Sequence, residues 1–205
     1  MNNIEIMGVL NITDNSFHDG GKYNSFKESL QHAKEMIHEG ADIIDIGAES
    51  SKPGSEPVSS EVQIKKIEPV VEAIREISDI PISIDTRSSD VIKKLTKYRI
   101  NIVNDISALQ DMELISVIKD NNLMVSLMHM QGVPKNMQDN PAYDDVVTDV
   151  YDYLEKKVQL CVNSGIDKSD IIIDPGFGFG KTLDHNYLLL NSCLLYTSDA
   201  ADELC

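Results

Sequence analysis

Three acid or amide side chains stand at the ends of apolar runs in the sequence: Asp85, Asn104 and Asp174. A carboxylate accepts two parallel N–H bonds and a carboxamide offers one donor and one acceptor, so together they could recognise the edge of a nitrogen heterocycle. Their oxygens could also bind a hard metal ion. The plainest alternative is helix capping, which explains any one of the three more easily than all of them.

The segment after Asp174 holds three alternating glycines, in Pro175-Gly-Phe-Gly-Phe-Gly-Lys181. A phosphate-binding P-loop needs a glycine five residues before Gly180, and Pro175 stands there, so that motif is absent. The glycines would let the backbone approach a flat ligand, which Phe177 could cover. We therefore predict a ligand-binding loop rather than a structural turn.

Other polar segments follow the remaining apolar runs. The long polar loop 11–21 is predicted to be functional, because long loops in compact domains are usually lids or disordered stretches. Lys52 and Lys181 are natural contacts for an anion in so acidic a chain, although single surface lysines often have no role. His129 is predicted to be a hydrogen-bonded wall residue, since the histidines show no metal-ligand spacing.

Six apolar runs are predicted to be strands, and segments with helical spacing alternate with them. The strands are 4–12, 42–47, 82–86, 101–106, 123–130 and 171–174, and the helices are 25–39, 60–77, 88–98, 111–120, 145–163 and 184–190. Ser25 with Glu28 and Ser60 with Gln63 fit capping boxes at two helix starts. Pro69 should kink the second helix or displace its start.

Regular alternation of strand and helix predicts a parallel sheet, either open or closed into a barrel. An open sheet gathers ligand groups from a few strands, whereas a (β/α)8 barrel gathers them from every strand at one face. Polar groups stand at every predicted strand end: Asn11, Asp45 with Glu49, Asp85, Asn104 with Asp105, His129 and Asp174. We therefore predict an α/β fold of the TIM-barrel class, incomplete because six of the eight βα units are found.

Length, charge and cysteine content narrow the class of protein. The chain has 205 residues and a net charge of −16, and this acidity argues against nucleic acid as a partner, because phosphate binding needs a basic face. No apolar run has the length of a membrane helix, and the first residues do not resemble a signal peptide. Three cysteines without regular spacing fit a reducing, cytoplasmic location.

The end of the chain departs from the rest. Residues from Cys193 onward resemble a translated sequencing-library adaptor, the alternative being an ordinary terminal helix or tail. We expect residues 1–191 to form the barrel and residues 192–205 to be a non-native tail.

Seven ordered motifs together resemble dihydropteroate synthase, over residues 4 to about 191. The resemblance implies a (β/α)8 barrel of folate biosynthesis that joins 6-hydroxymethyl-7,8-dihydropterin diphosphate to p-aminobenzoate, releases pyrophosphate with Mg²⁺, and is a target of sulfonamides. The motifs are Met7-Gly-Val-Leu-Asn-Ile-Thr13, Ser16-Phe-His-Asp-Gly-Gly21, Gly40-Ala-Asp-Ile-Ile-Asp-Ile-Gly-Ala-Glu-Ser-Ser-Lys-Pro-Gly54, Ile84-Asp-Thr86, Val103-Asn-Asp-Ile106, Leu127-Met-His-Met-Gln-Gly132 and Asp174-Pro-Gly-Phe-Gly-Phe-Gly-Lys181.

The same resemblance implies a role for each candidate residue. No residue is implied as a general acid or base, and the partners are small molecules, with a homodimer for the complete protein. The roles are pterin binding by Asp85, Asn104 and Asp174, diphosphate binding by Ser51, Mg²⁺ contact by Asn11, loop ordering around pyrophosphate and p-aminobenzoate by Phe17, Asp19, Lys52 and Pro53, and pocket lining by Met128 and Phe177.

Three departures from the family pattern set limits on this expectation. Asp14-Asn15 replaces the usual Pro-Asp, Lys52 replaces the usual arginine, and no seventh or eighth strand is found. We therefore expect the 205-residue chain to be inactive as a synthase. A pterin-binding methyltransferase of the methyltetrahydrofolate:corrinoid type is the alternative enzyme, and a non-catalytic paralogue that binds pterin or a partner protein is the alternative outside enzymes.

Overall fold

The computed structural model describes residues 4–12 and 22–193. One parallel sheet holds six strands in the order β1-β2-β3-β4-β5-β6, so each strand lies beside its neighbours in sequence. The strands are β1 (Met7–Asn11), β2 (Ile43–Gly47), β3 (Ile82–Asp85), β4 (Ile102–Asp105), β5 (Met124–Met128) and β6 (Ile171–Asp174). The predicted α/β fold with six βα units is therefore confirmed.

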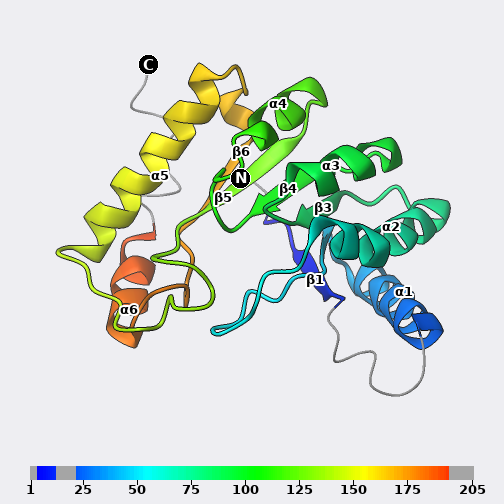
Figure 1. The fold of residues 1–205 in the computed structure, drawn as a ribbon, viewed down its shortest axis with the longest axis horizontal. Coiled ribbons are helices and arrows are strands. Elements are labelled where there is room, and N and C mark those ends of the chain that lie inside the picture. The colour runs from blue at the N-terminus through cyan, green and yellow to red at the C-terminus, as the bar shows by residue number, and fades with distance from the viewer. Residues whose placement is uncertain (1–3, 13–21, 194–205) are drawn as a thin grey trace.

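Helices connect the strands and lie around the outside of the curved sheet in chain order (Figure 1). The strand residues that point outward are mostly isoleucine and valine, and they pack against the buried stripe of each helix, as in Ile67, Val71 and Ile74 of the second helix. The helices are α1 (Lys22–Glu39), α2 (Ser60–Ile77), α3 (Ser89–Leu95), α4 (Glu113–Asp120), α5 (Val146–Asn163) and α6 (Leu183–Asn191), with 3-10 turns η2 (Thr96–Tyr98) and η3 (Lys168–Asp170).

The two capping boxes predicted for α1 and α2 are wrong. Helix α1 begins at Lys22, so Ser25 lies inside it, and α2 has Ser59 as its N-cap without a side-chain hydrogen bond. The side chain of Gln63 is used elsewhere, as described below. Pro69 lies inside α2, which continues through it as one helix to Ile77.

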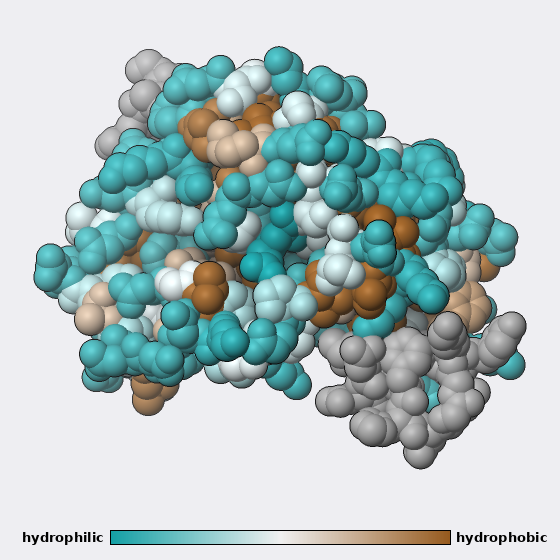
Figure 2. All heavy atoms as spheres, in the orientation of Figure 1, coloured by the Kyte–Doolittle hydropathy of each residue, from teal (hydrophilic) through white to brown (hydrophobic). Residues whose placement is uncertain are grey.

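The sheet has two edges in the part of the chain that the structure describes. Strand β1 pairs with β2 alone and β6 with β5 alone, and Val9 of β1 is 54% exposed. Within residues 4–12 and 22–193, no helix is long and apolar enough to cross a membrane. The face seen in Figure 2 is mainly hydrophilic, with apolar patches between the polar side chains, as the high net charge leads us to expect.

Candidate functional site

The strand register brings several predicted site residues into one row at the carboxyl end of the sheet. Asn11 pairs with Gly47, Gly47 with Asp85, and Asp85 with Asn104. Residues in register on parallel strands point to the same face, so these side chains project to the inner, concave side of the sheet. Asp85 and Asn104, predicted from the ends of separate apolar runs, are thus direct neighbours.

The carboxyl group of Asp85 lies over Gly47, in a space that a side chain there would fill. A Cβ at Gly47 would lie 3.2 Å from Asp85 Oδ2. The pKa of Asp85 is raised to about 8, mainly by burial and also by the negative charges of Asp45, Glu49 and Asp105, while the charge of Arg87 acts in the opposite direction. At neutral pH the free site therefore holds Asp85 largely protonated, and a ligand that donates N–H groups would favour its carboxylate.

Asp45 determines how Asn104 presents its amide. Asn104 Nδ2 donates to Asp45 Oδ2 at 3.1 Å, so the amide oxygen of Asn104 is turned away from Asp45 and is available as an acceptor. Asp45 itself is buried, burial raises its pKa, and its Oδ1 has no hydrogen-bond partner. A polar atom buried without a hydrogen-bond partner destabilises the fold. Its presence here therefore indicates that Asp45 has a role in the site besides packing.

Asp174 lies one layer further along the same face. It pairs in register with Met128, and the residue two positions before it, Ile172, pairs with Ser126, the partner of Asn104. Asp174 Oδ1 accepts from Gly176 N at 2.7 Å, so one oxygen fixes the turn that begins the β6–α6 loop. Asp174 is therefore not the cap of the helix that follows, since the N-cap of α6 is Thr182.

Two of the alternating glycines, Gly176 and Gly180, lie against the backbone of another loop. A Cβ at Gly176 would lie 2.0 Å from the His129 carbonyl oxygen, and a Cβ at Gly180 would lie 2.7 Å from that of Gln131. Both glycines have positive φ, of 68° and 63°. They let the β6–α6 loop pack against the backbone of the β5–α5 loop, and the predicted contact of this loop with a flat ligand stays a prediction. Phe177 between them is 43% exposed, so its side chain remains available to a ligand.

The prediction that Lys181 contacts an anion is wrong, because its ammonium group is buried and bound by the protein. Only 3% of the residue is exposed. Lys181 Nζ donates to the carbonyl oxygens of His129, Gly176 and Phe179 at 2.9–3.2 Å, and lies 3.0 Å from His129 Nδ1. Burial lowers its pKa to about 8. Lys181 therefore joins the two loops, and Lys52, which is exposed, remains as a candidate anion contact.

His129 is the buried wall residue that its sequence position predicted. Its ring meets the ring of Tyr153 edge to face at 4.9 Å, and its Nδ1 faces Lys181. Burial lowers the pKa of His129 to about 4, and the charge of Lys181 acts in the same direction. The neighbouring ammonium group disfavours protonation of the imidazole, so His129 would be a poor general base. We therefore assign it a structural role.

This pair predicts that the protein loses stability in mild acid. The folded pKa of His129 is about 4 and its ordinary value is 6.5, so between these values the unfolded chain binds more protons and unfolding is favoured as pH falls. We expect His129→Asn to remove about 3 kcal/mol of this pH dependence, measured by urea unfolding between pH 7 and 4. His32→Asn, on the exposed face of α1, is the control and should change nothing. Parallel pH profiles for His129→Asn and wild type would contradict the assignment.

Gln63, predicted to belong to a capping box, has a different role. Its amide nitrogen donates to Glu49 Oε2 at 3.1 Å and to the Val58 carbonyl at 2.8 Å, and its amide oxygen accepts from Thr86 Oγ1 at 2.8 Å. Glu49 and Val58 stand at the two ends of the β2–α2 loop. Gln63 therefore ties both ends of that loop to the end of β3.

The β2–α2 loop carries three of the predicted residues. Ser51 is half-buried, and Lys52 and Pro53 are exposed. The loop is tied to the β5–α5 loop by a hydrogen bond of 3.0 Å from Gly54 N to the Pro134 carbonyl. Three loops at the carboxyl end of the sheet are therefore joined to one another.

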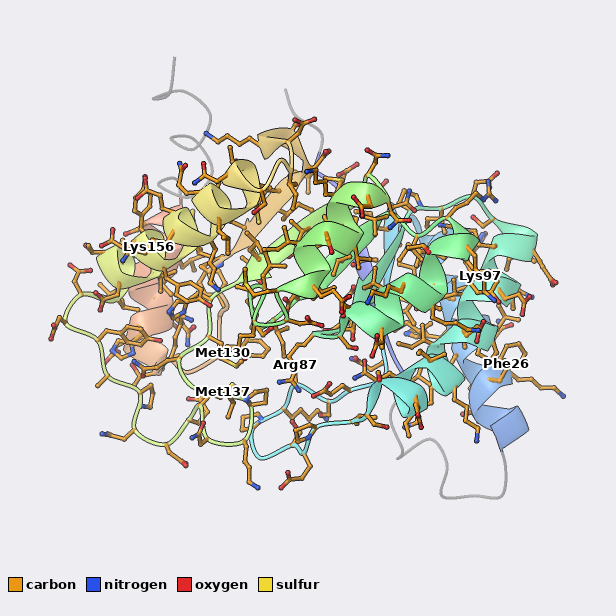
Figure 3. The ribbon with its side chains drawn as sticks, turned by 45° about the horizontal axis from the view of Figure 1, so that its top comes forward. Phe26, Arg87, Lys97, Met130, Met137 and Lys156 are labelled. Carbon is orange, nitrogen blue, oxygen red and sulfur yellow. The ribbon has the colours of Figure 1, made fainter. Side chains whose placement is uncertain are left out.

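Arg87 was not singled out from the sequence, although it stands two residues after Asp85. Its guanidinium forms an ion pair with Glu49, and it lies at the carboxyl end of the strands with Met130 and Met137 (Figure 3). The only signal in the sequence was a lone arginine close behind a candidate acid, which many surface arginines share. Its partner comes from 38 residues earlier in the chain.

The structure describes only some of the remaining predicted site residues. Phe17 and Asp19 lie outside the described residues, as do residues 194–205 of the predicted tail. Asn11 is exposed at the end of β1, and Met128 is buried, with its Cγ 3.1 Å from where a Cβ of Gly176 would stand. No group of three or more His, Cys, Asp or Glu side chains in residues 4–12 and 22–193 could hold a metal ion by itself.

A cavity of about 420 Å³ opens on another side of His129, lined by Gln131, Tyr143, Asp149 and Tyr153. No residue predicted to bind substrate lines it. The row of polar side chains, which is open at the concave face, is therefore the better candidate site.

Comparison with known proteins gives one family. The family described as pterin binding enzyme matches residues 7–194. Dihydropteroate synthase of Escherichia coli is 45% identical over 185 residues, which are 90% of this chain and 66% of that protein. The chain thus spans slightly less than two thirds of the length of this curated relative.

Two solved structures are similar in fold. Yersinia pestis dihydropteroate synthase in a sulfonamide drug complex has a TM-score of 0.85 and 43% identity, over 92% of this chain and 69% of that one. Xanthomonas albilineans dihydropteroate synthase with 4-aminobenzoic acid has a TM-score of 0.87 and 34% identity, over 95% and 69%. The row of polar side chains and the three joined loops lie within residues 7–194, which the family model matches.

Proposed function

Since the chain belongs to the dihydropteroate synthase family of pterin-binding enzymes, we propose that the whole protein condenses 6-hydroxymethyl-7,8-dihydropterin diphosphate with p-aminobenzoate in folate biosynthesis. The observation that carries this proposal is the adjacent pair Asp85 and Asn104, with Asp45 fixing the orientation of the Asn104 amide. A carboxyl and an oriented amide side by side match the donors and acceptors along the edge of a pterin ring.

The pterin would bind to Asp85, Asn104 and the remaining oxygen of Asp174, at the bottom of the concave face. The pterin-methyl C–O bond then breaks, and the electron pair leaves with pyrophosphate. The amine of p-aminobenzoate attacks the resulting carbon cation and loses a proton to give 7,8-dihydropteroate. The chemistry needs no strong base, which agrees with a site whose histidine is engaged by Lys181.

The departing diphosphate would lie toward the β2–α2 loop. The Ser51 hydroxyl and the Lys52 ammonium are the groups we assign to it there. Asn11 supplies one neutral oxygen at the end of β1, and Mg²⁺ is commonly held by few protein ligands together with substrate phosphates. These residues fit Mg²⁺ bound through Asn11 and the diphosphate, and the ion would neutralise the charge that develops on pyrophosphate.

The p-aminobenzoate would lie between the loops that Lys181 and Gly54 join. We assign Pro53, Met128 and Phe177 to its pocket. The family resemblance assigns Phe17 and Asp19, which lie outside the described residues, to loop ordering around pyrophosphate and p-aminobenzoate. The Yersinia pestis relative binds a sulfonamide drug, and we propose that sulfonamides compete with p-aminobenzoate in this protein too. A cytoplasmic location and a homodimer are proposed for the complete protein from the family resemblance.

Titration with 6-hydroxymethylpterin, followed by the fluorescence of the pterin, tests the proposal. We expect saturable binding to the wild-type chain and binding at least about tenfold weaker to Asn104→Leu, which removes both amide contacts. Gln31→Ala on exposed α1 is the control. Equal binding by Asn104→Leu would overturn the pterin site.

A second measurement separates synthesis from binding. Pyrophosphate release by the complete protein should require p-aminobenzoate. Pterin binding without that release selects the non-catalytic paralogue, and methyl transfer from methyltetrahydrofolate selects the alternative enzyme.

A further inference from the structure

Arg87 stands between the two halves of the proposed substrate site. It follows Asp85, the last residue of β3, by two positions, and its guanidinium pairs with Glu49 at the start of the β2–α2 loop. Its side chain is 25% exposed, so it is not wholly enclosed by the protein. Figure 3 places it at the carboxyl end of the sheet.

The guanidinium of Arg87 has donors that the protein leaves unused. Nη2 donates to Glu49 Oε1, whereas Nε is buried and has no hydrogen-bond partner. A guanidinium carries five N–H donors in a planar fork, which suits the paired oxygens of a phosphate. A buried donor without an acceptor is costly, so a ligand that supplies the acceptor would be stabilised there.

The carboxylates around Arg87 would repel an anionic substrate, and the positive charge of Arg87 would offset that repulsion. Asp45, Glu49 and Asp105 all lie close enough to Asp85 to act on it electrostatically, and Arg87 counters their effect. Lys181 is bound to carbonyl oxygens and His129 and cannot contact a ligand. Lys52 offers an exposed point charge without a planar fork. Among the described residues, Arg87 therefore adds a second cation to Lys52 at this end of the sheet.

We infer that Arg87 binds the diphosphate of the pterin substrate, exchanging Glu49 for phosphate oxygens when the substrate enters. Glu49 keeps its hydrogen bond from Gln63, at 3.1 Å, so its carboxylate is not left without a partner after the exchange. This inference rests on the proposed function, since it takes the pterin diphosphate as the substrate. It assigns Arg87 to substrate binding, beside Ser51 and Lys52.

Paired titrations of the chain with 6-hydroxymethylpterin and with its dihydropterin diphosphate, in the presence of Mg²⁺, test the inference. We expect Arg87→Gln to weaken binding of the diphosphate at least about tenfold, and to change binding of the alcohol less than about threefold. Arg87→Lys should recover part of the loss, because it restores the charge but not the fork.

Glu49→Gln is the matched control, because it breaks the same ion pair and leaves the guanidinium free. It should bind the diphosphate at least as tightly as wild type does. Equal losses in Arg87→Gln and Glu49→Gln, or a loss in Arg87→Gln that is the same for both ligands, would overturn the role of Arg87. Failure of the wild-type chain to bind either pterin would instead overturn the proposed function.

Discussion

Asp85→Asn is expected to make the folded protein more stable at pH 8 while it removes pterin binding. The folded pKa of Asp85 is about 8 and its ordinary value is 3.8, so the fold favours the protonated carboxyl group. The resulting stabilisation is complete below pH 3.8 and is lost as pH rises toward 8. Asn cannot ionise, and we expect its free energy of unfolding to exceed that of wild type by about 2–4 kcal/mol at pH 8, with little difference near pH 4.

Urea unfolding at several pH values measures this difference. Asp90→Asn on α3, where the carboxylate is 69% exposed, is the control and should follow the wild-type profile. In the same variants, Asp85→Asn should bind 6-hydroxymethylpterin at least about tenfold more weakly, because it loses a charge-assisted contact. A variant that is less stable than wild type at pH 8 would show that Asp85 is a structural residue rather than a strained ligand.

Gly176→Ala is expected to destabilise the protein by about 3–5 kcal/mol. The new Cβ would lie 2.0 Å from the carbonyl oxygen of His129, and that oxygen is held in place by Lys181. The two loops would therefore have to separate, which breaks the hydrogen bonds of the buried ammonium group. The fluorescence-monitored midpoint of urea unfolding gives the change.

Gly178→Ala is the control that separates the cost of the steric contact at residue 176 from the cost of a positive φ at a residue with a side chain. Gly178 also has a positive φ, 82°, but nothing lies within 4 Å of its Cβ position. Its substitution should cost only the strain, about 1–2 kcal/mol. Similar costs at the two positions would mean that the close approach of the loops contributes nothing.

The strands and their order could be predicted from the sequence because they depend on local properties. Six apolar runs that alternate with helical spacing suffice to predict six parallel strands. The register that makes Asp85 and Asn104 neighbours depends on all the strands together, and only the structure shows it. The candidate acids were found because polar residues at strand ends are conspicuous, whereas Arg87 stands in a loop and has a distant partner.

The errors share one physical cause, which is contact between segments far apart in the chain. The contacts of Gly176 and Gly180 were missed because their neighbour, the loop at His129, is almost fifty residues earlier in sequence. Lys181 was expected at the surface because burial of a lysine needs several acceptors, and no local pattern reveals three converging carbonyl groups. Gln63 fitted a local capping pattern, but its side chain binds Glu49, Val58 and Thr86 instead.

The buried ammonium of Lys181 also bears on the order in which the molecule assembles. Its acceptors come from the loops after β5 and after β6, so neither loop alone can satisfy it. β6 must pair with β5 before the Lys181 ammonium group can be buried. The free-energy cost of dehydrating it is then offset by all of its hydrogen bonds together. The two loops should therefore open and close as a single cooperative unit, with their amide protons exchanging at a common rate although they are remote in the chain.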